Sequence, residues 1–396
     1  MKQVTIVGLG MSADTLTAEG LCAVQQADVL IGAPRLIEQF KSLHKPAFAE
    51  YTPEAVAHVL DENEGERFCV LVSGDTGFYS AADGLCATLK GYPLTLLPGI
   101  SSLSYLFARL LRPWQEVAIV SCHGRRANLV DTVRRNRLTF ALTGGNMKEL
   151  GDELTNAGFG ELTAYIGENL GLAQERILML PVSRLSTAGI GKLAVLLVEN
   201  LKPDNRVRFG IPDGEFIRGD DVPMTKSEVR AVTMSRLALR PQAVCCDIGA
   251  GTGSVTVEMA LAAYEGRVYA VDKSEEAIRL VTANCRAFCL GNVTPVLGSA
   301  PEVLEALPPV DAVFIGGNAG RLREIFDALL VKNPLTHIVV NAVTLETLHE
   351  ATQAFAVHRI ACEITQLSVT RTTPVGSLHM LKPCSPVFIL SGGLYG

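Results

Sequence analysis

The sequence predicts an α/β protein of two domains, each with an open sheet that binds ligands at the ends of its strands. Three observations predict this class. The chain has 396 residues, which is more than one ordinary hydrophobic core holds. Apolar strands run into glycine-bearing turns at 2–10 and again at 243–253. A polar segment with a proline, 201–205, separates the halves, so we expect domains at 1–202 and 203–396.

Composition narrows the class of protein further. Hydrophobic residues make up 48% of the chain and charged residues 19%, and no apolar run approaches the roughly 18 residues of a membrane helix. The net charge of −6 argues against a nucleic-acid partner. Ten cysteines without C-x-x-C pairs, and an N-terminus that enters a strand directly, are typical of a cytoplasmic protein. We expect no membrane association and no metal site.

The stretch 243–253 predicts a nucleoside site. An apolar strand ends there in Asp247, and glycines follow at alternate positions. These are Gly249, Gly251 and Gly253. Glycine lets the backbone take positive φ angles and lets a ligand lie against bare peptide, at the N-terminus of a helix expected over 256–263. Ser254 stands where a nicotinamide site has its third glycine, and a second strand ends in Asp272, which is placed to accept ribose hydroxyls.

The first half has its own set of strand-end loops. It opens as a β-α-β unit, with strands in 2–10 and 28–31 around a helix in 15–26. Further strands end in polar, glycine-bearing loops at 73–79, 98–102 and 143–146. Because open α/β sheets bind ligands at the carboxyl ends of their strands, we expect a ligand site there.

Six segments of the first half occur in the order seen in tetrapyrrole methylases. They are VGLG, ADVLIGAPRLIE, LVSGDTGFYS, PGISSLSYLFARL, ALTGG and YIGENLG. This half resembles the cobalamin-pathway branch of that family, and the resemblance implies a two-lobed fold with S-adenosylmethionine in the cleft between the lobes. The cofactor-binding positions that it implies are Gly74, Asp75, Thr76, Ser101, Ser102, Ala141 and Leu142. The first loop, 8–12, departs from the Gly-x-Gly-Pro-Gly of many relatives.

The second half resembles the decarboxylating precorrin methyltransferases. Its matching segments are Ile-Pro-Asp at 211–213, Thr-Lys-x-Glu-Val-Arg at 225–230, the glycine triad and the stretch 311–318. The resemblance implies a Rossmann-like class I methyltransferase domain with a second S-adenosylmethionine site. The positions expected to bind that cofactor are Thr225, Asp247, Gly249, Ala250, Gly251, Thr252, Gly253, Asp272 and Ala300.

In this order the two halves resemble the fused precorrin-6Y C(5,15)-methyltransferases (decarboxylating) of cobalamin biosynthesis. The resemblance implies methylation of a precorrin-6B type substrate at carbons 5 and 15, with loss of carbon dioxide from the ring C acetate, to give precorrin-8 or the cobalt equivalents. It assigns carbon 5 to 1–202, and carbon 15 with the decarboxylation to 203–396. The partners we expect are a tetrapyrrole substrate and further copies of the chain in a homo-oligomer.

Methyl transfer from a sulfonium donor to the macrocycle requires little acid or base catalysis by the protein. A sulfonium donor is already activated and the macrocycle is a nucleophile, so we expect the protein mainly to align the reactants and exclude water. The candidates for proton transfer or for binding substrate carboxylates are Asp213, Lys226 and Arg230, with Arg208 as a further clamp. A solvated loop or helix-surface charge stays an alternative for each. Thr225 and Glu228 have the spacing of a capping box.

Two alternatives belong to other classes of enzyme. An S-adenosylmethionine-dependent methyltransferase acting on RNA would show a basic surface, and an amino-methylating one would carry an Asn/Asp-Pro-Pro-aromatic loop where this chain has 315–318. An oxidoreductase would need the third glycine that the triad lacks. The sequence leaves open whether the substrate carries cobalt, in which order the methyl groups are added and which residues move protons.

Overall fold

The computed structural model describes residues 2–123, 128–317 and 320–393, so Asn318 of the 311–318 motif lies outside the described residues. The chain divides into two compact units. The first comprises Met1–Arg126, Arg137–Gly151 and Leu162–Leu201, and the second comprises Ala127–Asn136, Asp152–Glu161 and Lys202–Gly396. Two short segments of the first half of the sequence therefore belong to the second unit in space.

A five-stranded parallel sheet opens the first unit, with its strands in the order β3-β2-β4-β1-β5. The strands are β1 (Gln3–Gly8), β2 (Val29–Gly32), β3 (Ala47–Phe48), β4 (Arg67–Val72) and β5 (Leu94–Leu97), and the helices are α1 (Ala18–Gln26), α2 (Pro34–Ile37), α3 (Pro53–Glu62) and α4 (Ala82–Thr88). Alternate residues of β1 face opposite sides: Ile6 packs with α3 and α4, and Val7 packs with α1 and α2. The β-α-β start expected from the sequence is confirmed.

A second, mixed sheet completes the first unit, in the order β6-β7-β10-β8-β9. Its strands are β6 (Ala118–Ser121), β7 (Leu138–Leu142), β8 (Thr163–Glu168), β9 (Arg176–Pro181) and β10 (Ala194–Glu199), and its helices are α5 (Ser102–Arg109) and α7 (Met147–Leu154). Helix α5 packs Leu106 and Phe107 with Phe140 and Leu197 of the sheet. The first unit thus has two lobes, each built on its own sheet, which confirms the fold that the resemblance implies.

A seven-stranded sheet forms the second unit, in the order β13-β12-β11-β14-β15-β19-β16. Its strands are β11 (Val244–Ile248), β12 (Arg267–Asp272), β13 (Val293–Leu297), β14 (Ala312–Ile315), β15 (His337–Ala342), β16 (Glu363–Leu367) and β19 (Val387–Gly392), and its helices are α8 (Ser227–Leu237), α9 (Ser254–Ala262), α10 (Glu275–Ala287), α11 (Leu322–Lys332) and α12 (Leu345–Val357). Only β19 runs antiparallel to the central strands. The order reverses between β11 and β14, which is the switch point at which such sheets bind ligands.

Helix α6 (Leu129–Arg135) belongs to the first half of the sequence but packs in the second unit. The Asn128 side chain donates a hydrogen bond to the Tyr264 carbonyl oxygen at 2.7 Å. The Arg135 guanidinium lies 3.8 Å from the centre of the Tyr264 ring, within the range of a cation–π contact. The second unit is therefore not one continuous stretch of chain.

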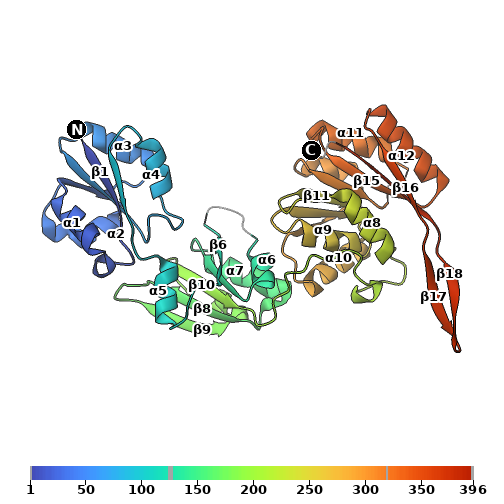
Figure 1. Cartoon of the computed structure of the whole chain (residues 1–396), viewed down its shortest axis with the longest axis horizontal. Helices are drawn as coiled ribbons and strands as arrows, with labels where there is room; N and C mark the ends of the chain where they lie inside the picture. Colours follow the sequence, from blue (N-terminus) through green and yellow to red (C-terminus); the bar gives the residue numbers. More distant parts are fainter. Residues whose placement is uncertain (1, 124–127, 318–319, 394–396) are drawn as a thin grey trace. The chain divides into compact units, whose positions relative to one another are not determined.

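A separate hairpin leaves the large sheet between β16 and β19. Its strands, β17 (Thr370–Val375) and β18 (Leu378–Pro383), pair only with each other among the described strands, and Figure 1 shows them in red, projecting from the sheet. All residues of the two strands are exposed except Arg371, which is half-buried.

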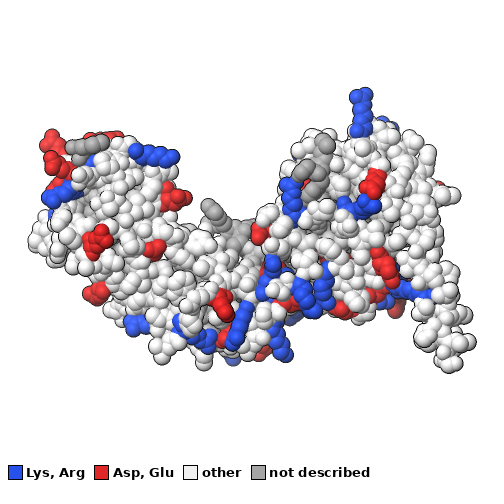
Figure 2. All heavy atoms as spheres, in the orientation of Figure 1, with Lys and Arg blue, Asp and Glu red and all other residues white. Residues whose placement is uncertain are grey.

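The described surface carries charges of both signs. Figure 2 shows acidic and basic side chains interspersed on the face that it draws. In the described part of the chain, no helix is long and apolar enough to span a membrane.

Candidate functional site

Three backbone loops meet at the carboxyl edge of the first sheet, after β1, β4 and β5. Gly10 and Gly74 exchange two backbone hydrogen bonds, with N···O distances of 3.1 and 3.0 Å. A Cβ at Gly8 would lie 2.7 Å from the Gly74 carbonyl oxygen, and one at Gly99 would lie closer still. Glycine is therefore required where these loops touch, and the first loop supports the other two.

The carboxylate of Asp75 ties two of these loops together. Its Oδ1 accepts a hydrogen bond from the Gly77 N–H at 2.8 Å, and its Oδ2 accepts one from the Gly99 N–H at 3.1 Å. Because both oxygens bond to backbone, Asp75 fixes the shape of the loop that carries it.

A cavity of about 1100 Å³ is lined by residues of both lobes of the first unit. It exceeds the roughly 300–1,000 Å³ of typical small-molecule sites, so it has room for more than one ligand. The predicted cofactor residues that line it are Gly74, Asp75, Thr76, Ser102 and Leu142. Ser101 and Ala141 are buried and do not line it: Ser101 caps α5 by accepting from the Ser104 N–H, and Ala141 is 0% exposed in β7, so their contact with a cofactor stays a prediction.

Three basic side chains that the sequence did not single out also line this cavity. They are Arg35, His123 and Lys192. In 2–123, 128–317 and 320–393, none of the three has a hydrogen-bonding or ion-pairing partner for its side chain. By contrast, Arg109 and Arg176 of the same unit each pair with a glutamate. Arg35 lies in α2, within the segment ADVLIGAPRLIE, whereas His123 follows β6 and Lys192 precedes β10.

The glycine triad follows β11 at the switch point of the second sheet. Its φ angles are +77° at Gly249, +55° at Gly251 and +78° at Gly253, which confirms the predicted need for glycine. A Cβ would lie 2.7 Å from the Gly317 nitrogen at the first position and 2.5 Å from the Pro223 carbonyl oxygen at the second. The chain's own backbone, rather than open space for a ligand, therefore lies against these two glycines.

Asp272 ends β12 beside this loop, and its side chain is half-buried. Its Oδ2 accepts from the Gly251 N–H and its Oδ1 accepts from the Ser274 N–H, both at 2.9 Å. The turn after β13, which contains Ala300, is joined to the same strand end because the Gly298 N–H donates to the Asp272 carbonyl oxygen at 2.9 Å. A half-buried acid beside a loop of bare peptide fits the ribose of a nucleoside.

Asp247 and Thr252 are buried beneath the loop rather than facing a ligand. Asp247 is 0% exposed, and its Oδ2 accepts from the Thr256 hydroxyl at 2.5 Å. Its Oδ1 and the Thr252 hydroxyl oxygen have no partner among the described residues. Burial, together with the nearby charge of Asp272, raises the pKa of Asp247 to about 7. Ala250 is also buried, so these residues shape the loop from within.

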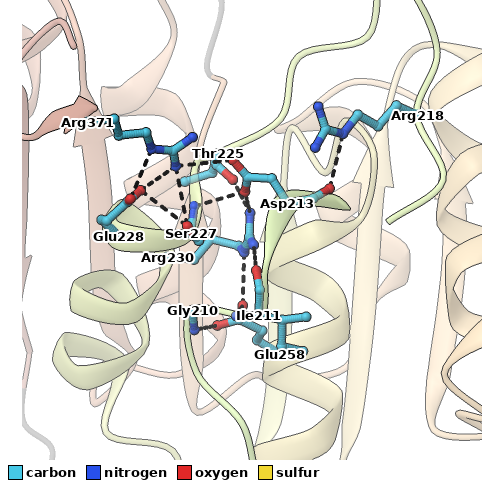
Figure 3. Close-up of polar contacts among 10 residues, drawn as sticks. All are labelled: Gly210, Ile211, Asp213, Arg218, Thr225, Ser227, Glu228, Arg230, Glu258 and Arg371. Carbon is cyan, nitrogen blue, oxygen red and sulfur yellow. Dashed lines mark hydrogen bonds and ion pairs between the residues drawn. The ribbon is translucent and has the colours of Figure 1, made fainter. Parts of the chain in front are cut away.

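Arg230 of α8 lies at the centre of the polar network drawn in Figure 3. It is 0% exposed, and its Nε donates to Glu258 at 2.9 Å while its Nη1 donates to Asp213 at 3.1 Å. The same guanidinium donates to the carbonyl oxygens of Thr225 and Ile211. The prediction of Arg230 as a clamp for substrate carboxylates is corrected, because its donors are occupied and it has no exposed surface.

The start of α8 also differs from the prediction. The helix begins at Ser227 with Lys226 as its N-cap, so Thr225 and Glu228 do not form a capping box. The capping acceptor is Asp213, whose Oδ1 accepts from the Ser227 N–H at 3.0 Å. Lys226 itself is exposed, and its side chain has no hydrogen bond or ion pair with the residues that the structure describes. It is therefore the one predicted catalytic candidate with a side chain free to meet a substrate.

Arg208, the further candidate for binding substrate carboxylates, is part of the local packing, and two residues that the sequence analysis did not name belong to the polar network. Arg208 pairs with Glu215 at 3.0 Å and stacks on the Phe288 ring at 5.9 Å, which leaves it part of the local packing. Glu258 could have been found from sequence, because a single acid in the apolar helix 254–262 implies a buried partner. Arg371, which also joins the network in Figure 3, carries no local signal.

We predict that Arg230→Met lowers the free energy of unfolding of the second unit by about 3–5 kcal/mol, because it leaves the charge of Glu258 buried without its partner. Arg236→Met is the matched control on the same helix. Its partner Glu363 is exposed, so the loss should stay below about 1 kcal/mol. Denaturant unfolding of the full chain measures both, and equal losses would refute the role given to Arg230.

We predict that Asp247→Asn stabilises the second unit, and more so at high pH. The folded pKa of about 7 lies above the ordinary value of 3.8, so as pH rises from about 4 to 7 this carboxyl ionises in the unfolded chain but stays protonated in the folded one, and the wild type loses stability. Asparagine keeps an acceptor for the Thr256 hydroxyl and never ionises. Calorimetric melting of both proteins near pH 5 and pH 8 should give a difference in Tm that grows with pH; a constant difference would contradict the assignment.

Two family models match the chain, one in each half. The model of the tetrapyrrole (corrin/porphyrin) methylases matches residues 3–186, and that of the precorrin methyltransferase domain matches residues 217–392. These matches confirm the two resemblances expected from the sequence.

Individual relatives agree with the family models. A precorrin-6Y C(5,15)-methyltransferase [decarboxylating] of Sinorhizobium sp. is 29% identical over 96% of this chain and 92% of its own length. A cobalt-precorrin-6B C(15)-methyltransferase (decarboxylating) of Salmonella typhi is 38% identical over 45% of this chain and 93% of its own. A crystal structure of precorrin-6y C5,15-methyltransferase from Geobacter metallireducens GS-15 is 38% identical, covers 47% of this chain and 97% of that one, and has a TM-score of 0.45. The chain therefore belongs to the decarboxylating precorrin-6Y C(5,15)-methyltransferase family, in which a tetrapyrrole methylase domain precedes a precorrin methyltransferase domain.

Proposed function

We propose that this chain uses S-adenosylmethionine to methylate carbons 5 and 15 of a precorrin-6B type substrate and removes carbon dioxide from the ring C acetate. The observation that carries the proposal is the match over 96% of the chain to the precorrin-6Y C(5,15)-methyltransferase [decarboxylating] of Sinorhizobium sp.. The cavity of the first unit and the glycine loop of the second support it as two separate cofactor sites. We assign carbon 5 to residues 1–202, and carbon 15 with the decarboxylation to 203–396.

The cavity of the first unit is our proposed site for methylation at carbon 5. S-adenosylmethionine, when bound, supplies a methyl group on an activated sulfonium at either site. The chain's own part is to hold the reactants in line and to exclude water. The loop fixed by Asp75 forms one wall. Arg35 and Lys192, which have no side-chain partner among the described residues, are suited to substrate carboxylates, with two parallel hydrogen bonds in the case of arginine.

The glycine loop of the second unit is our proposed site for methylation at carbon 15. The backbone N–H groups of Gly251 and Ser274 orient the carboxylate of Asp272, and each of its oxygens keeps a lone pair for a ribose hydroxyl. The buried Asp247 and Thr252 hold the loop in shape below it.

Decarboxylation needs an acceptor for the electron pair of the broken carbon–carbon bond. The tetrapyrrole can supply that acceptor, because the ring next to the acetate takes up the pair before a proton replaces the lost carboxyl group. We assign Lys226 the contact with a substrate carboxylate, since it is an exposed, unpaired cation among the described residues. Asp213 and Arg230 support it from below.

The expectations for partners and location stay predictions. We propose a tetrapyrrole as the substrate, a cytoplasmic location, a homo-oligomeric assembly and no nucleic-acid partner. The RNA methyltransferase alternative is not favoured, because the names of the relatives described above specify precorrin or cobalt-precorrin.

We predict that Asp272→Ala weakens S-adenosylmethionine binding at the second site by about 1–3 kcal/mol, because hydroxyl groups lose a charged acceptor. At a limiting concentration of the donor, methylation at carbon 15 should fall while methylation at carbon 5 continues. Nuclear magnetic resonance of the product made with an isotope-labelled methyl donor resolves the two carbons. Asp327→Ala is the control, since it removes an exposed acid of the same unit. Equal losses at both carbons would show that the sites are not separate.

A further inference from the structure

Arg371 anchors the projecting hairpin to the start of α8. Its Nε donates to Glu228 Oε1 at 3.0 Å, and its Nη2 donates to Glu228 Oε2 at 2.5 Å. Two parallel bonds fix orientation as well as distance. The hydrogen bond from Arg371 is the largest cause that lowers the pKa of Glu228 to about 2, so the pair is charged at neutral pH.

The same guanidinium reaches the residues that surround the helix start. Its Nη2 lies 3.3 Å from Ser227 Oγ and 3.3 Å from Asp213 Oδ2. The other oxygen of Asp213 accepts from the buried Arg230 at 3.1 Å. Figure 3 shows the carboxylate of Asp213 between the two guanidinium groups, so the surface arginine and the buried arginine hold one acid from opposite sides.

Lys226 lies between the two points that these arginines hold. Arg230 donates to the carbonyl oxygen of Thr225, the residue before it, and Arg371 donates to the hydroxyl of Ser227, the residue after it. The backbone of Lys226 is extended, with φ −72° and ψ 153°. Arg230 thus holds the backbone before Lys226, while Asp213 holds the Ser227 N–H and Arg371 the Ser227 hydroxyl after it, and Lys226 itself is exposed.

We propose that Arg371 is a positioning residue that holds Lys226 in place for the substrate of the second unit. The inference rests on the proposed function, which assigns Lys226 its contact with a substrate carboxylate. Arg371 acts through Glu228, Ser227 and Asp213. It comes from a strand 143 residues after Glu228 in the chain, so the hairpin and the helix start are held as one structure.

The test compares Arg371→Ala and Arg371→Lys with Lys382→Ala in the full chain. Lys382 is the matched control, because it is paired directly opposite Arg371 in the hairpin, is exposed, and contacts no described side chain by hydrogen bond or ion pair. Hydrogen exchange of the segment 221–229 reports its order without any cofactor or substrate. Steady-state kinetics with saturating methyl donor report methylation at carbons 15 and 5.

In Arg371→Ala we expect faster exchange in 221–229 and a kcat at carbon 15 that is roughly 10- to 100-fold lower, the scale of a misplaced contact. Methylation at carbon 5 should stay unchanged, and Arg371→Lys should restore part of both signals because it keeps a charge for Glu228. Lys382→Ala should match the wild type within about 2-fold, as an exposed charge contributes little.

The proposal is overturned if Arg371→Ala matches Lys382→Ala in both measurements, or if exchange rises only in the hairpin, 370–383, and not in 221–229. If Arg371→Ala does not fold, the lysine variant decides: partial loss with a folded chain supports the proposal, and wild-type exchange and kinetics refute it. A wild type without activity at carbon 15 would refute the proposed function instead, and the exchange data would still decide whether Arg371 orders the segment.

Discussion

The buried guanidinium of Arg230 is the constraint on which the second site depends. A cation without exposed surface is tolerated only where charged and polar partners replace water, and here Glu258 and Asp213 do so. Glu258 belongs to α9, the helix that begins at the glycine triad, and Asp213 belongs to the segment that leads into α8. The network therefore joins α9 to the segment that leads into α8. The same segment also contacts the glycine loop, because its Pro223 carbonyl oxygen accepts from the Thr252 N–H at 3.4 Å.

The strand-end loops of the two units are held in place by partly different contacts. In the first unit, backbone lies against backbone at Gly8 and Gly99, so a side chain at either position would displace a strand-end loop. In the second unit, backbone also lies against Gly249 and Gly251, and the buried ion pairs of Arg230 add side-chain charges whose removal would leave a partner unpaired. In both, the loops lie at the carboxyl ends of parallel strands, where the chain changes direction and backbone groups are open to ligands.

The sequence predicted what local patterns determine. The strands before 8–10 and 249–253, the positive φ angles of the triad and the Asp272 strand end follow from period and from glycine's conformational freedom. The predictions were wrong where a residue distant in the sequence determines the structure. The N-terminus of α8 is capped by Asp213, 14 residues earlier, and Arg230 is buried because it pairs with Glu258. Packing of 128–136 and 152–161 in the second unit is likewise a tertiary outcome that no local pattern shows.

The central claim is that one chain holds two independent sites for the same methyl donor. Isothermal titration calorimetry of the intact chain with S-adenosylmethionine tests it most directly, because it counts bound molecules without need of the tetrapyrrole. We predict two molecules bound per chain, one in the cavity of the first unit and one at the glycine triad of the second. A single bound molecule at saturation would contradict the claim.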